Sequence, residues 1–587
     1  MARLSTPELD IRSDARSSPN TVQTPKDKSE YGPDLEEEQD SRNEPQPHVH
    51  AKTWLALFAI CLIYFSQTFV LVGTGAQGQA IAVYLNRSGD AVWLTATLTI
   101  PSVVLGPIVA QTADYWGRKW LLVGSCMLGT GGCLIASRAT TFSIFLLGQT
   151  ITGLHFGVLP LLHAIPSEIL PRRWRAPSQA AVMIANSFGL IIGLILGGVF
   201  TSDDNTEGFR NYFYIATGLL ALGTIIGFFA YTPPPTPLQT SFSLSEKLSR
   251  LDWIGYILLA SSLVLFCIGL CWSQNPYPWS DAHTLAPFAI GVALGIALVV
   301  YETKFKTDGM FHHGLFQGKD WNFAISLAAV FCEGVAFFAT TVYFPFQVGF
   351  LYEADPLLVG VRFSIAFIAT IPASVITGLY CTITKKVRWV TVFSFIIFVV
   401  FFVCMATSDE GSGTLVWGYP VLLGSALGMT LITLVTVAQL CTPPQLISIA
   451  SGLIISIRSL GGTVGIAIYN AVMSDETSQA GDRIAQAALE AGLPGSSLEQ
   501  FVGNLIRHNE TGVQQAPGVT PEIVEAGLDA LVGTFVKGFQ HVWITAAAFV
   551  SLAVIATIFL TDPSDEFNNR IDAPVEDDHA LYGDQEE

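Results

Sequence analysis

Apolar residues follow one another in fourteen long stretches along this chain of 587 residues, and polar segments separate the stretches. Each stretch is long enough for an α-helix to cross a bilayer, which takes about 20 residues. The pattern therefore predicts an all-α polytopic membrane protein with 14 transmembrane helices. The predicted spans are 53–74, 91–112, 120–137, 142–165, 178–200, 211–231, 253–272, 284–302, 321–347, 358–380, 388–407, 415–438, 446–472 and 541–561.

Lys and Arg are distributed unevenly between these stretches. The loops that follow the even-numbered stretches hold thirteen Lys and Arg residues. This number includes Arg388, the first residue of the eleventh stretch. The short loops after the odd-numbered stretches hold only Arg87, Arg138 and Arg210. Because loops rich in Lys and Arg stay in the cytoplasm, the pattern predicts an even number of spans with both tails cytoplasmic.

The polar segments also predict the domain organisation. The tails, 1–51 and 562–587, are acidic and polar, so we expect disordered cytoplasmic segments. Between the tails, the chain divides into groups of six, two and six stretches. We expect an N-terminal six-helix bundle (52–231), a linker with two extra transmembrane helices (232–320), and a C-terminal six-helix bundle (321–561) with a long outer loop (473–540).

Composition supports a membrane class, because 51% of the residues are apolar and only 13% are charged, against about 25% charged in soluble domains. Nothing in the charge pattern suggests a nucleic-acid partner. No cleavable signal peptide is visible. Cys267 and Cys271 lie one helical turn apart, but no His or acid joins them, so we expect packing and neither a metal site nor a cofactor. Two glycosylation sequons begin at Asn86 and Asn509, and Asn509 is the better acceptor because Asn86 lies close to the membrane.

A charge cluster joins the second and third stretches and contains Asp114, Gly117, Arg118 and Lys119. Asp114 stands at the negative end of one predicted helix, and the two bases stand at the positive end of the next. Each placement opposes the helix dipole, which costs about 0.3–1 kcal/mol if the charge is exposed. The preference of Lys and Arg for cytoplasmic loops explains the positions of Arg118 and Lys119 but not that of Asp114. A charge latch that closes the cytoplasmic side explains all three, so we interpret this segment as a gating motif.

Few ionisable groups are predicted at mid-membrane. Glu333 lies near the middle of the ninth stretch and Arg458 near the middle of the thirteenth. A lone charge at that depth costs at least about 2.5–3.5 kcal/mol. Two interpretations stay open. In the first, Glu333 is a proton or substrate site and Arg458 is its partner or an anion clamp. In the second, the two residues form a purely structural ion pair. His163, on the fourth stretch, is a candidate proton relay or a hydrogen-bonded structural residue.

The segment from Ala110 to Lys119 resembles the signature loop of the major facilitator superfamily, with Ala110 in place of a Gly and Tyr115 in place of a base. The fourteen-span plan resembles the drug-proton antiporter branch of that superfamily, and within it the fungal trichothecene efflux pumps and siderophore transporters. Further similar segments are Ser167-Glu168-Ile169-Leu170-Pro171, Asp252-Trp253-Ile254-Gly255, Gly269-Leu270-Cys271-Trp272 and Arg458-Ser459-Leu460-Gly461-Gly462.

This resemblance implies the major facilitator fold, a small-molecule substrate and protons as a candidate coupling ion. One departure concerns Gln149, which stands four residues before Gly153, where the antiporters carry an Arg. The first stretch has Ser66-Gln67-Thr68 where the family has Asp-x-Thr. These departures weaken the case for proton coupling through the usual family positions, and we keep Gln149 as a candidate coupling or substrate residue.

The leading hypothesis is a secondary transporter that exports a small amphipathic metabolite, toxin or drug. The alternative within transport is uptake of a siderophore–iron chelate, and the alternative from another class is a non-transporting membrane sensor. We expect no enzymatic activity, because no nucleophile–base or metal-ligand cluster is visible. We expect a monomer in the lipid bilayer of the plasma membrane, with a vacuolar or other internal membrane as the alternative.

The topology can be tested with epitope tags in sealed vesicles. Tags in the first fifty residues and at the C-terminus should react from the cytoplasmic face, and a tag within 473–540 should react from the opposite face. An N-terminal tag that is protected on the cytoplasmic face would contradict this arrangement.

Overall fold

The computed structural model describes residues 47, 49–87, 90–200, 207–235, 237–273, 277–306, 309–310, 313–316, 321–353, 355–506, 512–513 and 516–575. All of them belong to one compact unit, Gln46–Glu587. The described residues form helices, turns and loops, with no strand among them.

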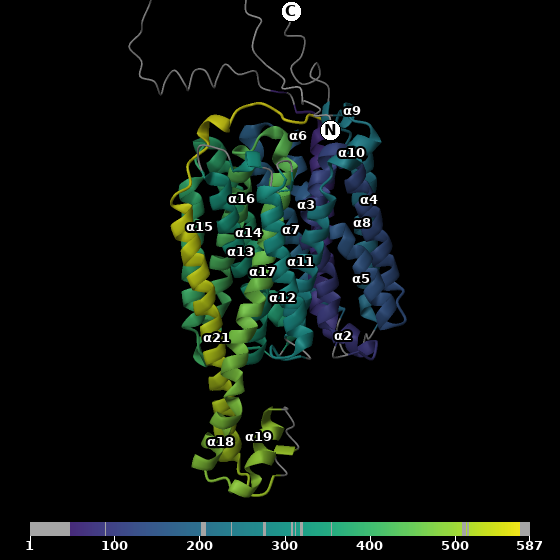
Figure 1. Ribbon diagram of the computed structural model, residues 1–587. Coiled ribbons are helices and arrows are strands. Elements are labelled where there is room, and N and C mark those ends of the chain that lie inside the picture. Colours follow the sequence, from purple (N-terminus) through teal and green to yellow (C-terminus); the bar gives the residue numbers. More distant parts are fainter. Residues whose placement is uncertain are drawn as a thin grey trace, which may run out of the picture. The chain divides into compact units, whose positions relative to one another are not determined.

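Fourteen helices are long and apolar enough to cross a membrane, and each corresponds to one predicted stretch (Figure 1). The predicted fold class is therefore confirmed. In chain order the helices are α2 (Ala51–Tyr84), α3 (Val92–Trp116), α4 (Arg118–Ser137), α5 with α6 (Phe142–Phe156 and Leu159–Ile169), α7 (Arg175–Val199), α8 (Gly208–Ala230), α11 (Trp253–Trp272), α12 (Ala282–Lys304), α13 (Asn322–Leu351), α14 (Pro356–Thr384), α15 (Arg388–Ala406), α16 (Tyr419–Leu440), α17 (Ile447–Ser478) and α21 (Pro521–Thr557).

Shorter elements join these helices. They are η2 (Arg172–Trp174), α9 (Pro237–Thr240), α10 (Leu244–Arg250), η3 (His313–Leu315), η4 (Glu410–Trp417), η5 (Pro444–Leu446), α18 (Ala480–Glu490), η6 (Gly495–Ser497), α19 (Leu498–Ile506) and η7 (Ser564–Glu566). The fourth span is divided into α5 and α6 near Gly157, and Pro160 lies in the first turn of α6, where its missing N–H costs nothing.

The helices of the two halves repeat one contact pattern. In the first half, α2 packs on α7 and α8, α4 packs on α5 and α8, and α3 packs on α5. In the second half, α13 packs on α17 and α21, α15 packs on α16 and α21, and α14 packs on α16. In this repeat, α3 corresponds to α14 and α7 corresponds to α17. The two contacts between the halves, α7 with α14 and α3 with α17, are therefore equivalent to each other. Such a repeat is typical of transporters built from two parallel halves.

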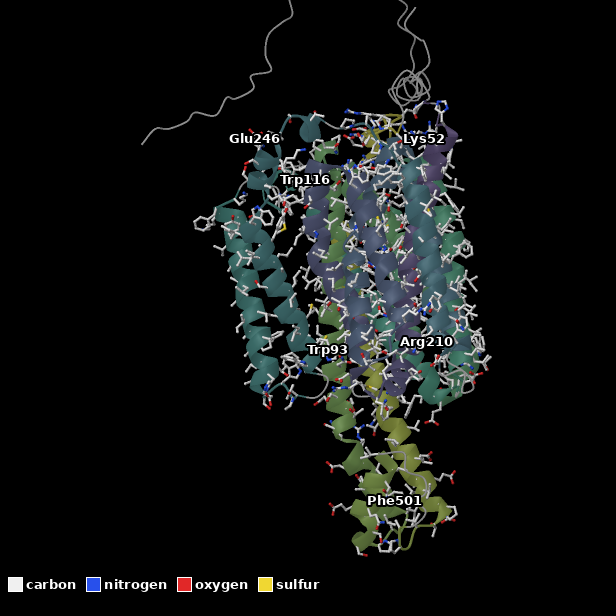
Figure 2. The ribbon with its side chains drawn as sticks, turned by 90° about the vertical axis from the view of Figure 1, so that its right-hand side faces the viewer. Lys52, Trp93, Trp116, Arg210, Glu246 and Phe501 are labelled. Atoms are coloured by element: carbon white, nitrogen blue, oxygen red, sulfur yellow. The ribbon has the colours of Figure 1, made fainter. Side chains whose placement is uncertain are left out.

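The extra helices α11 and α12 pack mainly on each other, and α11 also contacts α3 and α17. Figure 2 shows this pair beside the other helices. The same view places Lys52, Trp116 and Glu246 at one end of the helices, and Trp93 and Arg210 toward the other. We call the first the terminal end, because α2 begins there and α21 ends there (Figure 1).

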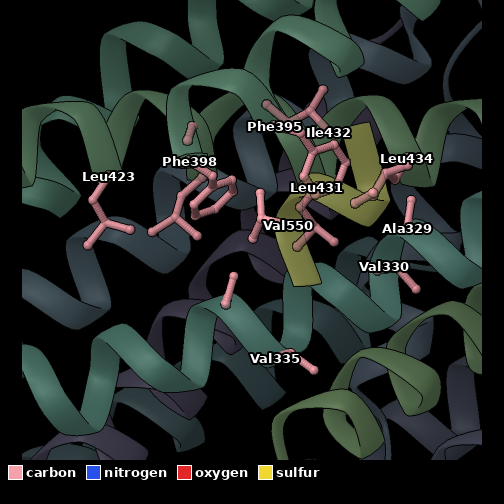
Figure 3. Close-up of a cluster of buried hydrophobic side chains, with 14 of the residues drawn as sticks. Ala329, Val330, Val335, Phe395, Phe398, Leu423, Leu431, Ile432, Leu434 and Val550 are labelled. Atoms are coloured by element: carbon pink, nitrogen blue, oxygen red, sulfur yellow. The ribbon is translucent and has the colours of Figure 1, made fainter. Parts of the chain in front are cut away.

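The largest apolar core lies mainly in the second half, with a contribution from α7, and includes Val335, Phe398, Leu431 and Val550 (Figure 3). Two smaller cores lie in the first half. Many large apolar side chains on the outer faces are exposed, for example Phe229 (71%) and Ile383 (78%). This arrangement suits contact with lipid, which removes the cost of exposing apolar surface to water.

At the end opposite the terminal end, several spans are longer than predicted, and α2 continues ten residues past its predicted end at position 74. Helix α17 continues to Ser478 and α21 begins at Pro521, so helices occupy much of the predicted loop 473–540. Thr520 is the N-cap of α21, and its side chain accepts a hydrogen bond from the Ile523 N–H. Helices α18 and α19 pack on the α21 extension around Ile484 and Phe501 and form a small apolar cluster, which we call the α18–α19 cluster.

The glycosylation sequons are not tested by this fold. Asn86 follows α2 with a positive φ of 57°, a conformation that Asn tolerates better than most residues. Asn509 lies outside the described residues.

Candidate functional site

Arg118 lies at the centre of a buried ionic cluster at the terminal end. Its Nη2 is 3.3 Å from Asp114 and 2.8 Å from Glu168, and its Nε donates a hydrogen bond of 3.0 Å to the Ser448 hydroxyl. We call these four residues the Arg118 cluster. All four side chains are buried. Because Ser448 belongs to the first turn of α17 and the other three to the first half, the cluster ties the two halves together.

The gating role that the sequence suggests for this segment stays a prediction. Asp114 and Arg118 pair as expected for a latch. Three arginines, Arg172, Arg173 and Arg175, lie close to Glu168 in sequence, but the structure pairs Glu168 with Arg118. Lys119 does not join the cluster, and its Nζ lies 5.1 Å from the centre of the Phe228 ring.

Gly117 positions Arg118 through its backbone. Its φ and ψ are 89° and 149°, a region that is essentially restricted to glycine. A Cβ on Gly117 would also lie 3.3 Å from the Gln239 side chain of α9. This turn lets α4 begin immediately after α3 ends, so that Asp114 and Arg118 face each other.

A second polar layer, which the sequence reasoning missed, surrounds Gln439. The Gln439 carbonyl oxygen accepts a hydrogen bond of 2.7 Å from Arg175, and its side-chain oxygen accepts one of 2.6 Å from Ser167. Its amide nitrogen donates to Ser451 and to the His163 carbonyl oxygen. We call this set the Gln439 network. It joins α6 and α7 of the first half to α16 and α17 of the second. The sequence feature that could have indicated this network is Gln439 itself, a polar residue at the end of an apolar stretch.

His163 is buried beside this network. Its Nδ1 lies 2.7 Å from the Gln179 oxygen, and its ring lies 5.4 Å from the Tyr64 ring. Its Nε2 has no hydrogen-bond partner among the described residues. The bonded Nδ1 fits the structural interpretation of His163, and the proximity to Tyr64 places its ring near the cavity described below.

Glu333 and Arg458 form an ion pair, as one of the two sequence interpretations required. The Arg458 Nε and Nη2 donate hydrogen bonds of 2.5 and 2.9 Å to the two Glu333 oxygens. The guanidinium carbon also lies 4.4 Å from the centre of the Phe337 ring. Glu333 is fully buried, whereas 15% of the Arg458 side chain is exposed. Two parallel hydrogen bonds and an aromatic face offset part of the cost of burying these charges.

A small cavity opens beside this pair, between the two halves. Its lining comes from α2 and α7 of the first half and from α13, α14, α16 and α17 of the second. The lining residues are Tyr64, Met183, Asn186, Ser187, Phe337, Phe367, Thr370, Leu427, Leu431 and Arg458. Its volume is about 30 Å³, which accommodates one or two water molecules but no organic solute. Arg458 is the charged residue of the lining, and most of the others are apolar or aromatic.

Gln149 lies apart from the ionic cluster and the cavity. It is buried in α5, and its amide nitrogen donates a hydrogen bond of 3.2 Å to Thr74 of α2. Among the described residues, no group of three or more His, Cys, Asp and Glu side chains could hold a metal ion. Cys267 and Cys271 are free thiols.

Comparison with known proteins agrees with this geometry. The family model described as Major Facilitator Superfamily matches residues 54–466. "MFS transporter L2" of a Phoma species is 22% identical over 89% of this chain and 83% of its own length. "Efflux pump FUS6" of Gibberella moniliformis is 23% identical over 88% of this chain and 90% of its own.

Among solved structures, the proton:xylose symporter XylE bound to 6-bromo-6-deoxy-D-glucose aligns with a TM-score of 0.53 at 12% identity. The alignment covers 88% of this chain and 98% of XylE, and at this identity it supports the fold alone. With a family match over most of the fourteen-helix body, the chain belongs to the major facilitator superfamily and is a multi-pass membrane transporter.

Proposed function

We propose that this protein exports small, amphipathic, largely apolar molecules by alternating access. The supporting observation is the cavity between the halves, whose lining is mainly apolar and aromatic and carries one charged group, Arg458. A strongly polar solute needs many buried hydrogen-bond partners, and the lining offers a few, from Tyr64, Asn186, Ser187, Thr370 and Arg458. The relatives named as efflux pumps support export over the alternative, uptake of a siderophore–iron chelate.

The terminal end is the cytoplasmic side in this proposal, and the Arg118 cluster is part of the cytoplasmic gate. The cluster and the Gln439 network both join the halves at that end, while the cavity is too small for a substrate. Transport then requires these contacts to break so that the halves separate on the cytoplasmic side and the cavity widens. The plasma membrane and a monomer are the setting that we propose for this cycle.

Arg458 is the group that we propose meets the polar part of the substrate. Glu333 occupies its Nε and Nη2, and Nη1 makes no hydrogen bond to a described residue. A neutral Glu333 would hold Arg458 less strongly, because the ionic part of the pair would be lost. Protonation of Glu333 would therefore release Arg458 to a hydrogen-bond acceptor on the substrate and couple transport to protons. A structural pair that never separates remains the alternative.

Export is tested by comparing cells that lack the gene with cells that carry it. Loss of the gene should raise the retention of apolar metabolites or the sensitivity to them, and the wild-type protein should reverse this. Met183→Trp, which fills the cavity, should fail to restore export at matched protein levels, because its bulk excludes the substrate. Ile195→Trp on the exposed face of the same helix is the matched control and should restore it. Unchanged retention together with a specific loss of ferric-chelate uptake would favour the siderophore alternative.

The Arg118 cluster is tested by Asp114→Asn and Arg118→Ala. Asp114→Asn leaves Glu168 as the acidic partner of Arg118, and Arg118→Ala leaves both buried carboxylates without the arginine. We expect transport to fall about tenfold in each variant while delivery to the membrane is kept. Lys304→Gln removes an exposed charge and should transport normally. Wild-type rates in both cluster variants, at equal amounts of protein, would rule out a gating role.

Coupling is tested by Glu333→Gln, which keeps the shape of the side chain but cannot gain or lose a proton. We expect transport by the variant to lose its dependence on pH, because the amide at this position carries no proton that the transport cycle could take up or release. Initial rates in vesicles at a series of pH values would measure this. A pH profile identical to that of the wild type would leave Glu333 as a structural partner of Arg458.

A further inference from the structure

The acidic C-terminal segment does not behave as its composition predicts. Disorder was expected from residue 562 onward, yet residues 562–575 are described and bound to the helices. We call these fourteen residues the strap. Figure 1 shows it in yellow, crossing the terminal end toward α6.

One end of the strap is fixed to the second half. The Asp562 carboxylate accepts hydrogen bonds of 2.6 and 2.8 Å from the backbone N–H groups of Val387 and Arg388, at the start of α15. The Ser564 hydroxyl donates a hydrogen bond of 3.0 Å to the Lys385 carbonyl oxygen. Since α21 leads directly into this region, the strap is also covalently continuous with the second half.

The other end is fixed to the first half by backbone hydrogen bonds. The N–H groups of Arg172 and Arg173 donate to the carbonyl oxygens of Arg570 and Asn568, at 3.0 and 2.9 Å. The Ala573 N–H donates to the Glu168 carbonyl oxygen at 2.9 Å. Val575, the last described residue, is buried in an apolar core of the first half, together with Leu57 and Leu170.

Asp572 makes the ionic part of this contact. Its carboxylate pairs with Arg175 and, at 3.0 Å, with Arg172. The Asp572 side chain is 2% exposed, and the Arg175 side chain is fully buried. Arg175 also donates to the Gln439 carbonyl oxygen of α16. Neutralising Asp572 would therefore remove the ion-pair partner of the buried Arg175 where the two halves meet, while Arg172 would keep its ion pair with Glu566.

We propose that the strap is part of the cytoplasmic gate and that Asp572 is its locking residue. This inference rests on the proposed alternating access, in which the cytoplasmic ends of the halves must separate. A segment bonded to both halves has to release one of them in that step. The first half is the side to be released, because the strap is covalently attached to the second.

The first experiment measures gate opening without any substrate. A cysteine at Ala180 serves as the reporter, because the Ala180 Cβ lies 3.2 Å from the position of a Cβ on Gly378, where α7 of the first half meets α14 of the second. Ala180 is 4% exposed and would become accessible only when these helices separate. The full-length protein is labelled in inside-out vesicles with a thiol reagent that does not cross membranes. The same chain without the reporter gives the background from the nine native cysteines.

Asp572→Asn should raise the labelling rate of the reporter about tenfold, because it weakens the contact that favours the closed state. Asp565→Asn is the matched control. It removes the same charge from an exposed residue of the strap and should leave labelling unchanged. Equal labelling of wild-type and Asp572→Asn protein would overturn the inference. Raised labelling supports the strap even if no exported substrate is found, so the two proposals can fail separately.

A second experiment locks the strap in place. Arg173→Cys and Asn569→Cys are combined, because the backbone hydrogen bond of 2.9 Å from Arg173 to Asn568 holds the two segments side by side. Oxidation to the disulfide should stop transport, and a reducing agent should restore it, whereas each single variant should not respond. Full transport by protein that is completely cross-linked would overturn the inference.

Discussion

The absence of water inside a bilayer controls where this chain can place its charges. A charged or polar group in that setting has to find its partner within the protein, because no solvent supplies one. The described helices satisfy this requirement at two levels. At mid-membrane, Glu333 and Arg458 pair with each other. At the terminal end, Arg118, Arg172 and Arg175 share Asp114, Glu168 and Asp572.

The two levels differ in which parts of the molecule they join. The Glu333–Arg458 pair lies within the second half, between α13 and α17, so it can stay intact while the halves move. The arginines of the terminal end join one half to the other, by hydrogen bonds to Ser448 and Gln439 and by ion pairs to the strap. The first level is therefore suited to meeting a ligand in the cavity, and the second to holding the molecule in one of its conformations.

The sequence predicted the features that depend on local composition. All fourteen spans followed from apolar length, and the Glu333–Arg458 pair was anticipated because two opposite charges at mid-membrane have few other partners. The exact partners at the terminal end could not be predicted in this way. Glu168 has three arginines close in sequence, yet it bonds Arg118, which lies 50 positions earlier. Asp572 belongs to a segment whose acidity indicates disorder, and its burial depends on two arginines about 400 positions away.

The α18–α19 cluster has a practical consequence for imaging this protein. Helices α17 and α21 run without interruption from the second half to the cluster, so the cluster is attached to that half by two continuous helices. An antibody fragment bound there would move with the second half as one body. Most of the particle consists of similar parallel helices, and the bound fragment would add a distinct landmark outside the detergent. The fragment would also identify which half has rotated between two reconstructions.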